Sequence, residues 1–170
     1  MRFPVGILMA AVGWLLAGCA GYHIGTTNGE RAGERSIQVN FFTNKTPQPR
    51  IVEAVNHSLR KALQQDGTYH LATRGDGDII VTGEILKYDR PALSYQPGDI
   101  LTIRDYQLSI VVHLVATERS TGKKLLERDV FGRTTVTITA DQTSAERQAL
   151  PLLADDFARQ AKGLLVDGTW

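Results

Sequence analysis

The chain has 170 residues, a formal net charge of +1 and a single cysteine. This length suits one domain with a sizeable core, and the near-neutral charge gives no support to a nucleic-acid partner. One cysteine cannot form a disulfide within the chain, so we expect the domain to fold on its hydrophobic core alone.

Residues 1–18 have the pattern of a secretory signal peptide. Arg2 supplies a short positive region, and the uncharged apolar run at 4–16 is too short to span the ~30 Å hydrocarbon core of a bilayer. The next residues, Leu16-Ala17-Gly18-Cys19, resemble the bacterial lipobox. We therefore expect cleavage before Cys19, and diacylglyceryl and N-acyl chains on Cys19 that anchor the protein to a membrane. No other cofactor is expected.

The first half of the mature chain is expected to hold a tether, a strand and a helix. Residues 19–35, rich in glycine, threonine and charge, predict a short tether that leads into a single domain of residues 36–170. Polar and apolar residues alternate over 36–41, which predicts a half-buried strand. Apolar residues at helical spacing then predict a helix from about Pro49 to Gln65, ended by Asp66-Gly67.

Strand signals dominate the middle of the chain. We expect a short strand at 68–73, a turn at 74–78, a strand at 79–88 broken by Gly83, and a loop at 91–98. The clearest strand is 105–118, where every second residue from Tyr106 to Ala116 is apolar and should face the core. A turn at 120–123 then leads to a return strand over about 124–138, with a bend at Gly132.

The last element is expected to be a second helix. Residues 143–146 match a capping box, in which Thr143 and Glu146 bond each other's backbone N–H groups, and Pro151 should kink or delay the helix. Two amphipathic helices need an apolar surface to cover. We therefore predict an α+β fold, a two-layer sandwich with a mainly antiparallel sheet of about four strands and both helices on one face.

A search for catalytic and metal-binding patterns returns nothing. The chain has no nucleophile elbow and no Walker loop, and its four histidines are scattered along the sequence. Asp155 and Asp156 are neighbours on a helix and should point to different sides. We expect no enzyme and no metal site. Arg104, Arg128 and Arg133 suit phosphate, because a guanidinium pairs well with it, although exposed arginines are common on sheets.

Several pieces of the mature chain, in their order and spacing, carry a family resemblance. They are Gly18–His23, the strand 37–42 leading into Asn44-x-Thr46 and Pro49, the helix that follows, Asp78-x-x-Val81-x-Gly83, the segment 106–117 with Gly122, and Ala145-Glu146-Arg147-x-Ala149. The mature sequence resembles the lipopolysaccharide-assembly lipoprotein family, LptE. The resemblance implies a non-enzymatic lipoprotein at the periplasmic face of the outer membrane. Such a protein plugs the β-barrel translocon LptD, assists its assembly and binds lipopolysaccharide during delivery.

One departure from the family concerns lipid contact. The family's lipid binding is attributed to basic side chains in loops near the long strand and before the last helix. Residues 95–99 and 139–142 hold no lysine or arginine here. The nearest candidates for lipopolysaccharide contact are therefore Arg104 and Arg133.

Two other functions stay open at this stage. A lipoprotein that regulates a peptidoglycan synthase also shows Phe-x-Asn-x-Thr before a helix, as at Phe42-x-Asn44-x-Thr46. The short tether, at most about 50 Å when extended, and the paired long strands favour the barrel partner. The polar face of the long strand, which includes His113, would suit either a barrel lumen or solvent. A small membrane-surface hydrolase is disfavoured, because no nucleophile–base pair is recognisable.

Overall fold

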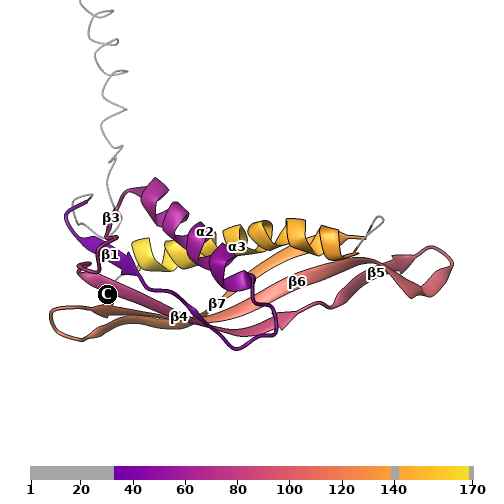
Figure 1. Ribbon diagram of the computed structural model, residues 1–170, viewed down its shortest axis with the longest axis horizontal. Coiled ribbons are helices and arrows are strands. Elements are labelled where there is room, and N and C mark those ends of the chain that lie inside the picture. The colour runs from indigo at the N-terminus through magenta and orange to yellow at the C-terminus, as the bar shows by residue number, and fades with distance from the viewer. Residues whose placement is uncertain (1–32, 139–141, 169–170) are drawn as a thin grey trace, which may run out of the picture.

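The computed structural model describes residues 33–138 and 142–168, which form one curved sheet with two helices over one of its faces (Figure 1). The elements in chain order are β1 (Ser36–Val39), β2 (Thr43–Asn44), α2 (Ile51–Asp66), β3 (His70–Leu71), β4 (Ile79–Asp89), β5 (Ala92–Gln96), β6 (Asp99–Glu118), β7 (Lys124–Thr137) and α3 (Gln142–Val166). The predicted α+β class and the two helices are confirmed.

Strand β6 organises the sheet. Antiparallel β7 lies along one side of it, and β4 and then β5 follow each other along the other side. The short strands β1 and β2 add to β4 in parallel, and β3 adds to β1. The sheet therefore has seven strands, more than the predicted four or so, because β2 and β5 form outside the predicted strands and the short strands β1 and β3 also join the sheet.

The core lies between the sheet and the helices. The predicted alternation of β6 is confirmed, since alternate side chains from Tyr106 to Ala116 are buried while their neighbours are partly exposed. Helix α2 buries a stripe at a spacing of four residues, from Ile51 through Val55 and Leu59 to Leu63. Burying each such side chain fully contributes about 1.5–3 kcal/mol, which makes this stripe the main reason that α2 docks.

Two glycines let an aromatic pair pack onto the sheet. A Cβ on Gly83 would lie 2.5 Å from the Phe42 ring, and one on Gly132 would lie 2.8 Å from the Cβ of Phe157. The rings of Phe42 and Phe157 meet edge to face, with centroids 6.3 Å apart. The expected break at Gly83 is therefore wrong, because β4 runs straight through it. At both positions glycine provides space for a neighbouring side chain.

The predicted loop at 91–98 is a strand and a tight turn. β5 occupies Ala92–Gln96, Pro97-Gly98 forms the turn, and β6 begins at Asp99, six residues earlier than predicted. A proline and a glycine can make a two-residue hairpin turn as readily as a loop. The turn that Pro97-Gly98 indicates is therefore present, but the strand residues on either side of it are not predicted.

The last helix begins earlier than the capping box predicts. α3 already includes Gln142, so Thr143 lies within the helix and not at its cap. Pro151 also lies inside the helix, with its ring exposed, and it does not delay the start. The Glu146 side chain of this pattern makes tertiary contacts.

Glu146 is buried and joins three separate parts of the fold. Its carboxylate accepts hydrogen bonds from the Tyr88 hydroxyl at the end of β4, from Arg90 at 3.1 Å and from Gln48 at 3.4 Å. Burial and the neighbouring Glu146 carboxylate both raise the pKa of Tyr88. Glu146 therefore ties the start of α3 to the end of β4 and to the segment before α2.

Replacing Glu146 with alanine is expected to lower the free energy of unfolding by about 1–3 kcal/mol. The Tyr88 hydroxyl, half buried, would lose its acceptor, and Arg90 would lose its counter-charge. Urea denaturation of the purified protein, followed by circular dichroism, measures the loss. Arg147→Ala, on the exposed side of the same turn, is the control and should leave the midpoint unchanged. Equal midpoints for wild type and Glu146→Ala would contradict this role.

Candidate functional site

An apolar hairpin projects from one end of the molecule. Strand β5 and the first part of β6 extend past both helices, and the described chain begins near β1 and β3 at the opposite end (Figure 1). Of the large hydrophobic side chains exposed in the described residues, five lie on this hairpin: Leu93, Tyr95, Ile100, Leu101 and Ile103. We call these five the hairpin tip. Ile100 is 82% exposed and Leu101 is 88% exposed.

The turn of this hairpin is built by Pro97 and Gly98. Gly98 has a φ of +82°, a conformation that glycine adopts without strain. Proline followed by glycine with positive φ is the signature of a type II turn. Type II turns match the twist of paired strands poorly. This mismatch accounts for the repeated register shifts between β5 and β6.

Asp99 orders the exposed start of β6. Its carboxylate accepts a hydrogen bond from the Leu101 N–H at 2.9 Å and one from the Thr102 hydroxyl at 2.5 Å. The Thr102 hydroxyl, and then the Leu101 N–H, lower the pKa of Asp99. The apolar side chains of Ile100 and Leu101 are thus presented on a backbone that local hydrogen bonds hold in place.

Asp105 fixes the base of the hairpin. Its carboxylate accepts hydrogen bonds from Ser94 on β5, from Thr137 on β7 at 2.6 Å and from Arg104 at 2.8 Å. These hydrogen bonds, with Ser94 contributing most, lower the pKa of Asp105 to about 2. One ionised side chain therefore links all three strands where the hairpin leaves the sheet.

The two predicted lipid-contact arginines lie apart. Arg104 is at the hairpin base and pairs with Asp105, and it precedes Tyr106 by two residues, on the same face as the helices. Arg133 pairs in register with Ser109, on the opposite face of the sheet, and its backbone N–H donates to Asp156 at 3.0 Å. The structure does not bring the two side chains together. Cys19, the predicted lipidation site, lies outside the described residues.

The sheet face opposite the helices carries a row of polar side chains. The row consists of register partners on β2, β4, β6 and β7, which are Thr43, Glu84, His113 and Asp129 in that order. His113 Nδ1 lies 2.7 Å from Asp129, and Nε2 lies 3.5 Å from Glu127. The hydrogen bond with Asp129, followed by the charges of Asp129 and Glu127, raises the pKa of His113.

The raised pKa of His113 predicts a pH-dependent contribution to stability. The contribution should be fully present below the unfolded-state pKa of 6.5 and lost as pH rises through the higher folded-state pKa. NMR titration of the ring should give a pKa above 6.5, and Asp129→Asn should bring it down. A ring that titrates below 6.5 in the wild-type protein would contradict the pairing.

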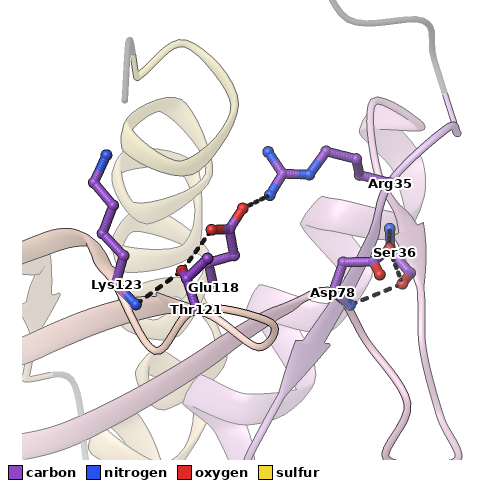
Figure 2. A network of polar contacts seen from close by, with 6 residues as sticks. All are labelled: Arg35, Ser36, Asp78, Glu118, Thr121 and Lys123. Carbon is purple, nitrogen blue, oxygen red and sulfur yellow. Dashed lines mark hydrogen bonds and ion pairs between the residues drawn. The ribbon is translucent and has the colours of Figure 1, made fainter.

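A polar network closes the end of the domain at which the described chain begins. Arg35 bonds Glu118 at 3.1 Å, and the Asp78 carboxylate accepts from both the N–H and the hydroxyl of Ser36 (Figure 2). Thr121 in the β6–β7 turn donates to Glu118 at 2.6 Å. These contacts fix the start of β1 against the end of the sheet far from the hairpin tip.

Two negative results apply to the part of the chain that the structure describes. Neither α2 nor α3 is long and apolar enough to cross a bilayer. No group of three histidine, cysteine or carboxylate side chains within residues 33–138 and 142–168 is arranged to hold a metal ion. The hairpin tip, in contrast, is an exposed apolar patch, and patches of this kind mark interaction sites.

The fold is shared with solved structures of bacterial proteins that have low sequence identity to this chain. A protein from Xanthomonas campestris has 10% identity and a TM-score of 0.61, with 85% of this chain and 91% of that one covered. A minor lipoprotein from Acinetobacter baumannii has 14% identity and a TM-score of 0.50, with 78% and 92% covered. The search of curated protein sequences found no match.

The family model for LptE, described as lipopolysaccharide-assembly, matches residues 34–161. This match spans β1 to most of α3 and so covers nearly the whole described domain. The chain therefore belongs to the LptE family, as the sequence resemblance predicted. This membership places it in the class of lipopolysaccharide-assembly lipoproteins. Its α+β domain exposes an apolar hairpin.

Proposed function

We propose that this chain is an outer-membrane lipoprotein that plugs the lipopolysaccharide translocon β-barrel LptD. It assists assembly of the barrel and delivery of lipopolysaccharide to the outer leaflet. Membership of the LptE family supports the role in lipopolysaccharide assembly. The observation that carries the partner role is the hairpin tip, which exposes Ile100 and Leu101 far from the core.

The hairpin tip has the chemistry of an interface. Keeping five large apolar side chains in water is unfavourable, and a fully exposed one gains about 1.5–3 kcal/mol when it is fully buried. A plug inside a barrel would bury well over the ~1,000 Å² expected of a specific interface. The polar row on the helix-free face, with Glu84, His113 and Asp129, suits a polar barrel lumen.

The anchor in this proposal is the lipid on Cys19, which becomes the N-terminus when residues 1–18 are removed. Residues 19–35 act as the tether, and the Arg35–Glu118 and Ser36–Asp78 contacts hold the entry of the domain. The acyl chains contribute about 0.8 kcal/mol per buried CH₂ and hold the protein at the periplasmic face of the outer membrane. The domain has no catalytic role in this account.

Lipopolysaccharide contact is assigned to Arg104 in this proposal, with Arg133 as a separate second contact. Arg104 lies at the base of the hairpin that carries the five exposed apolar side chains, so a cationic group lies close in the chain to an apolar patch. An amphipathic lipid has this combination of charged and apolar groups. The Asp105 carboxylate holds the guanidinium in place and competes with the phosphate for it.

A pull-down from native membranes tests the partner. The tagged lipoprotein is extracted in mild detergent, and the co-purifying proteins are identified and quantified. We expect a large β-barrel at about equal stoichiometry. Recovery of a peptidoglycan synthase without a barrel would overturn the proposal and favour the regulatory lipoprotein.

A further inference from the structure

A cavity with three arginines in its lining lies where the start of α3 meets the end of β4 and the segment before α2. Its volume is about 280 Å³. Its described lining residues are Gln48, Arg50, Arg90, Thr143, Glu146, Arg147 and Leu150. Three stretches of chain that are distant in sequence therefore converge around one space. We call it the arginine pocket.

The Asn44-x-Thr46 motif builds one wall of this pocket. Asn44 Oδ1 accepts hydrogen bonds from the Thr46 N–H at 2.9 Å and from the Thr46 hydroxyl at 2.8 Å. Asn44 Nδ2 donates to the Gln48 carbonyl at 3.0 Å. These bonds hold the chain in a fixed turn that leads directly into α2. The motif thus sets the positions of Gln48 and Arg50 at the cavity.

The buried Glu146 carboxylate orders the other walls. Glu146 is 9% exposed, and it accepts hydrogen bonds from Gln48 and Arg90, which belong to two different walls. The Tyr88 hydroxyl donates to the same carboxylate. Glu146 is therefore already engaged with groups of the protein, and it neutralises only one of the three guanidinium groups.

Two of the three arginines keep an uncompensated charge. Among the residues that the structure describes, neither Arg50 nor Arg147 forms an ion pair with a carboxylate, and both are exposed. With three arginines and one glutamate in its described lining, the pocket has a net charge of +2. A concave site lined by charges of one sign attracts ions of the opposite sign.

The lining also indicates which kind of anion fits. Guanidinium groups pair with both carboxylates and phosphates through parallel hydrogen bonds. Leu150 is the only apolar side chain in the described lining, and it is 6% exposed, so the acyl chains of a lipid would find no contact surface in the pocket. Small-molecule sites are typically ~300–1,000 Å³, so the cavity suits a few side chains better than a bulky ligand.

We propose that the arginine pocket is a docking site for a segment of a partner protein that carries neighbouring aspartate or glutamate side chains. The carboxylates of this segment pair with Arg50 and Arg147, while Arg90 stays on Glu146. Charge complementarity of this kind orients a partner and speeds its approach. The inference goes beyond the barrel partnership proposed above and does not depend on it.

The test is fluorescence anisotropy of a dye-labelled peptide rich in aspartate and glutamate, titrated with the full lipidated protein in non-ionic detergent. A matched peptide carries asparagine and glutamine instead. We expect the acidic peptide to bind about tenfold or more tightly than the matched one, and added salt should weaken its binding. The double variant Arg50→Gln with Arg147→Gln should weaken that binding about tenfold, with an unchanged thermal midpoint because both side chains are exposed.

Arg74→Gln with Arg128→Gln is the control, because it removes the same charge from two exposed arginines outside the pocket. It should bind the acidic peptide as the wild type does. An equal loss in both double variants would reduce the binding to general charge attraction and overturn the proposal. A wild-type protein that does not distinguish the two peptides would overturn it as well. Inorganic phosphate is added as a competitor, and if it binds as tightly as the acidic peptide, the pocket is a phosphate site and the proposal fails.

Discussion

Replacing Phe157 with alanine is expected to lower the free energy of unfolding by about 3–5 kcal/mol. The side chain is fully buried, and it joins the two layers of the fold. Its ring meets Phe42 edge to face, and its Cβ lies in the space that Gly132 leaves on β7. Truncation to alanine keeps the Cβ beside Gly132, but it removes the contact of the ring with Phe42 and leaves a cavity in the core. The loss is a large fraction of the 5–15 kcal/mol typical of a domain.

Urea denaturation followed by circular dichroism measures this loss, and Leu152→Ala is the matched control. Leu152 is on the same helix, but its side chain is 59% exposed, so its truncation should change stability by no more than about 0.5 kcal/mol. Equal effects of the two substitutions would show that α3 does not dock through Phe157. The packing derived for the aromatic pair would then be wrong.

Replacing both Ile100 and Leu101 with aspartate is expected to abolish recovery of the barrel in the pull-down. If the hairpin tip is buried against the partner, two unpaired carboxylates must lose their hydration there, at a cost of several kcal/mol. That cost corresponds to a fall in affinity of about a hundredfold or more. The stability of the isolated protein should hardly change, because both side chains are already in water.

Leu152→Asp is the control for the hairpin variant, because it also places a carboxylate at an exposed leucine but on α3. It should leave recovery of the barrel intact. Thermal unfolding of both variants shows that each is folded. Full recovery of the barrel with the hairpin variant would place the interface elsewhere on the molecule and contradict the proposed role of the tip.

The parts of the fold that could be predicted are those with a strong periodic pattern. The strand around Tyr106 to Ala116 and the helix from Ile51 to Leu63 each have one buried face. The spacing of their apolar residues therefore predicts which side chains are buried. The hairpin tip has no such face. Ile100, Leu101 and Ile103 are all exposed, and without a core to face they give no alternation that separates strand from loop.

Tertiary contacts explain the predictions that failed. Gly83 has the signature of a strand break, but its lack of a side chain makes room for Phe42, which lies about forty residues away in the chain. Glu146 has the spacing of a capping box, but it bonds Tyr88 and Arg90 in preference. In both cases a distant partner overrides the local pattern, and one sequence does not reveal that partner.

Some residues of the candidate sites could be predicted from the sequence, and others could not. Arg104 could be singled out from the sequence because arginine suits phosphate, but its separation from Arg133 follows from the register of β6 and β7. The cavity of about 420 Å³ beside Phe41 could not be predicted. It requires α2 to pack beside the open edge of β1, which brings Asn56 and Arg60 next to Phe41.

Site-specific photocross-linking in living cells tests the central claim most directly. A photoreactive amino acid is placed at Leu101 on the hairpin tip, and a second variant carries it at Thr121, in the turn at the opposite end of the sheet. The account predicts a cross-link from position 101 to a large β-barrel protein, and a much weaker one or none from position 121. If the photoreactive residue at position 101 cross-links to no barrel, or only to a peptidoglycan synthase, the proposed role of the hairpin tip is contradicted.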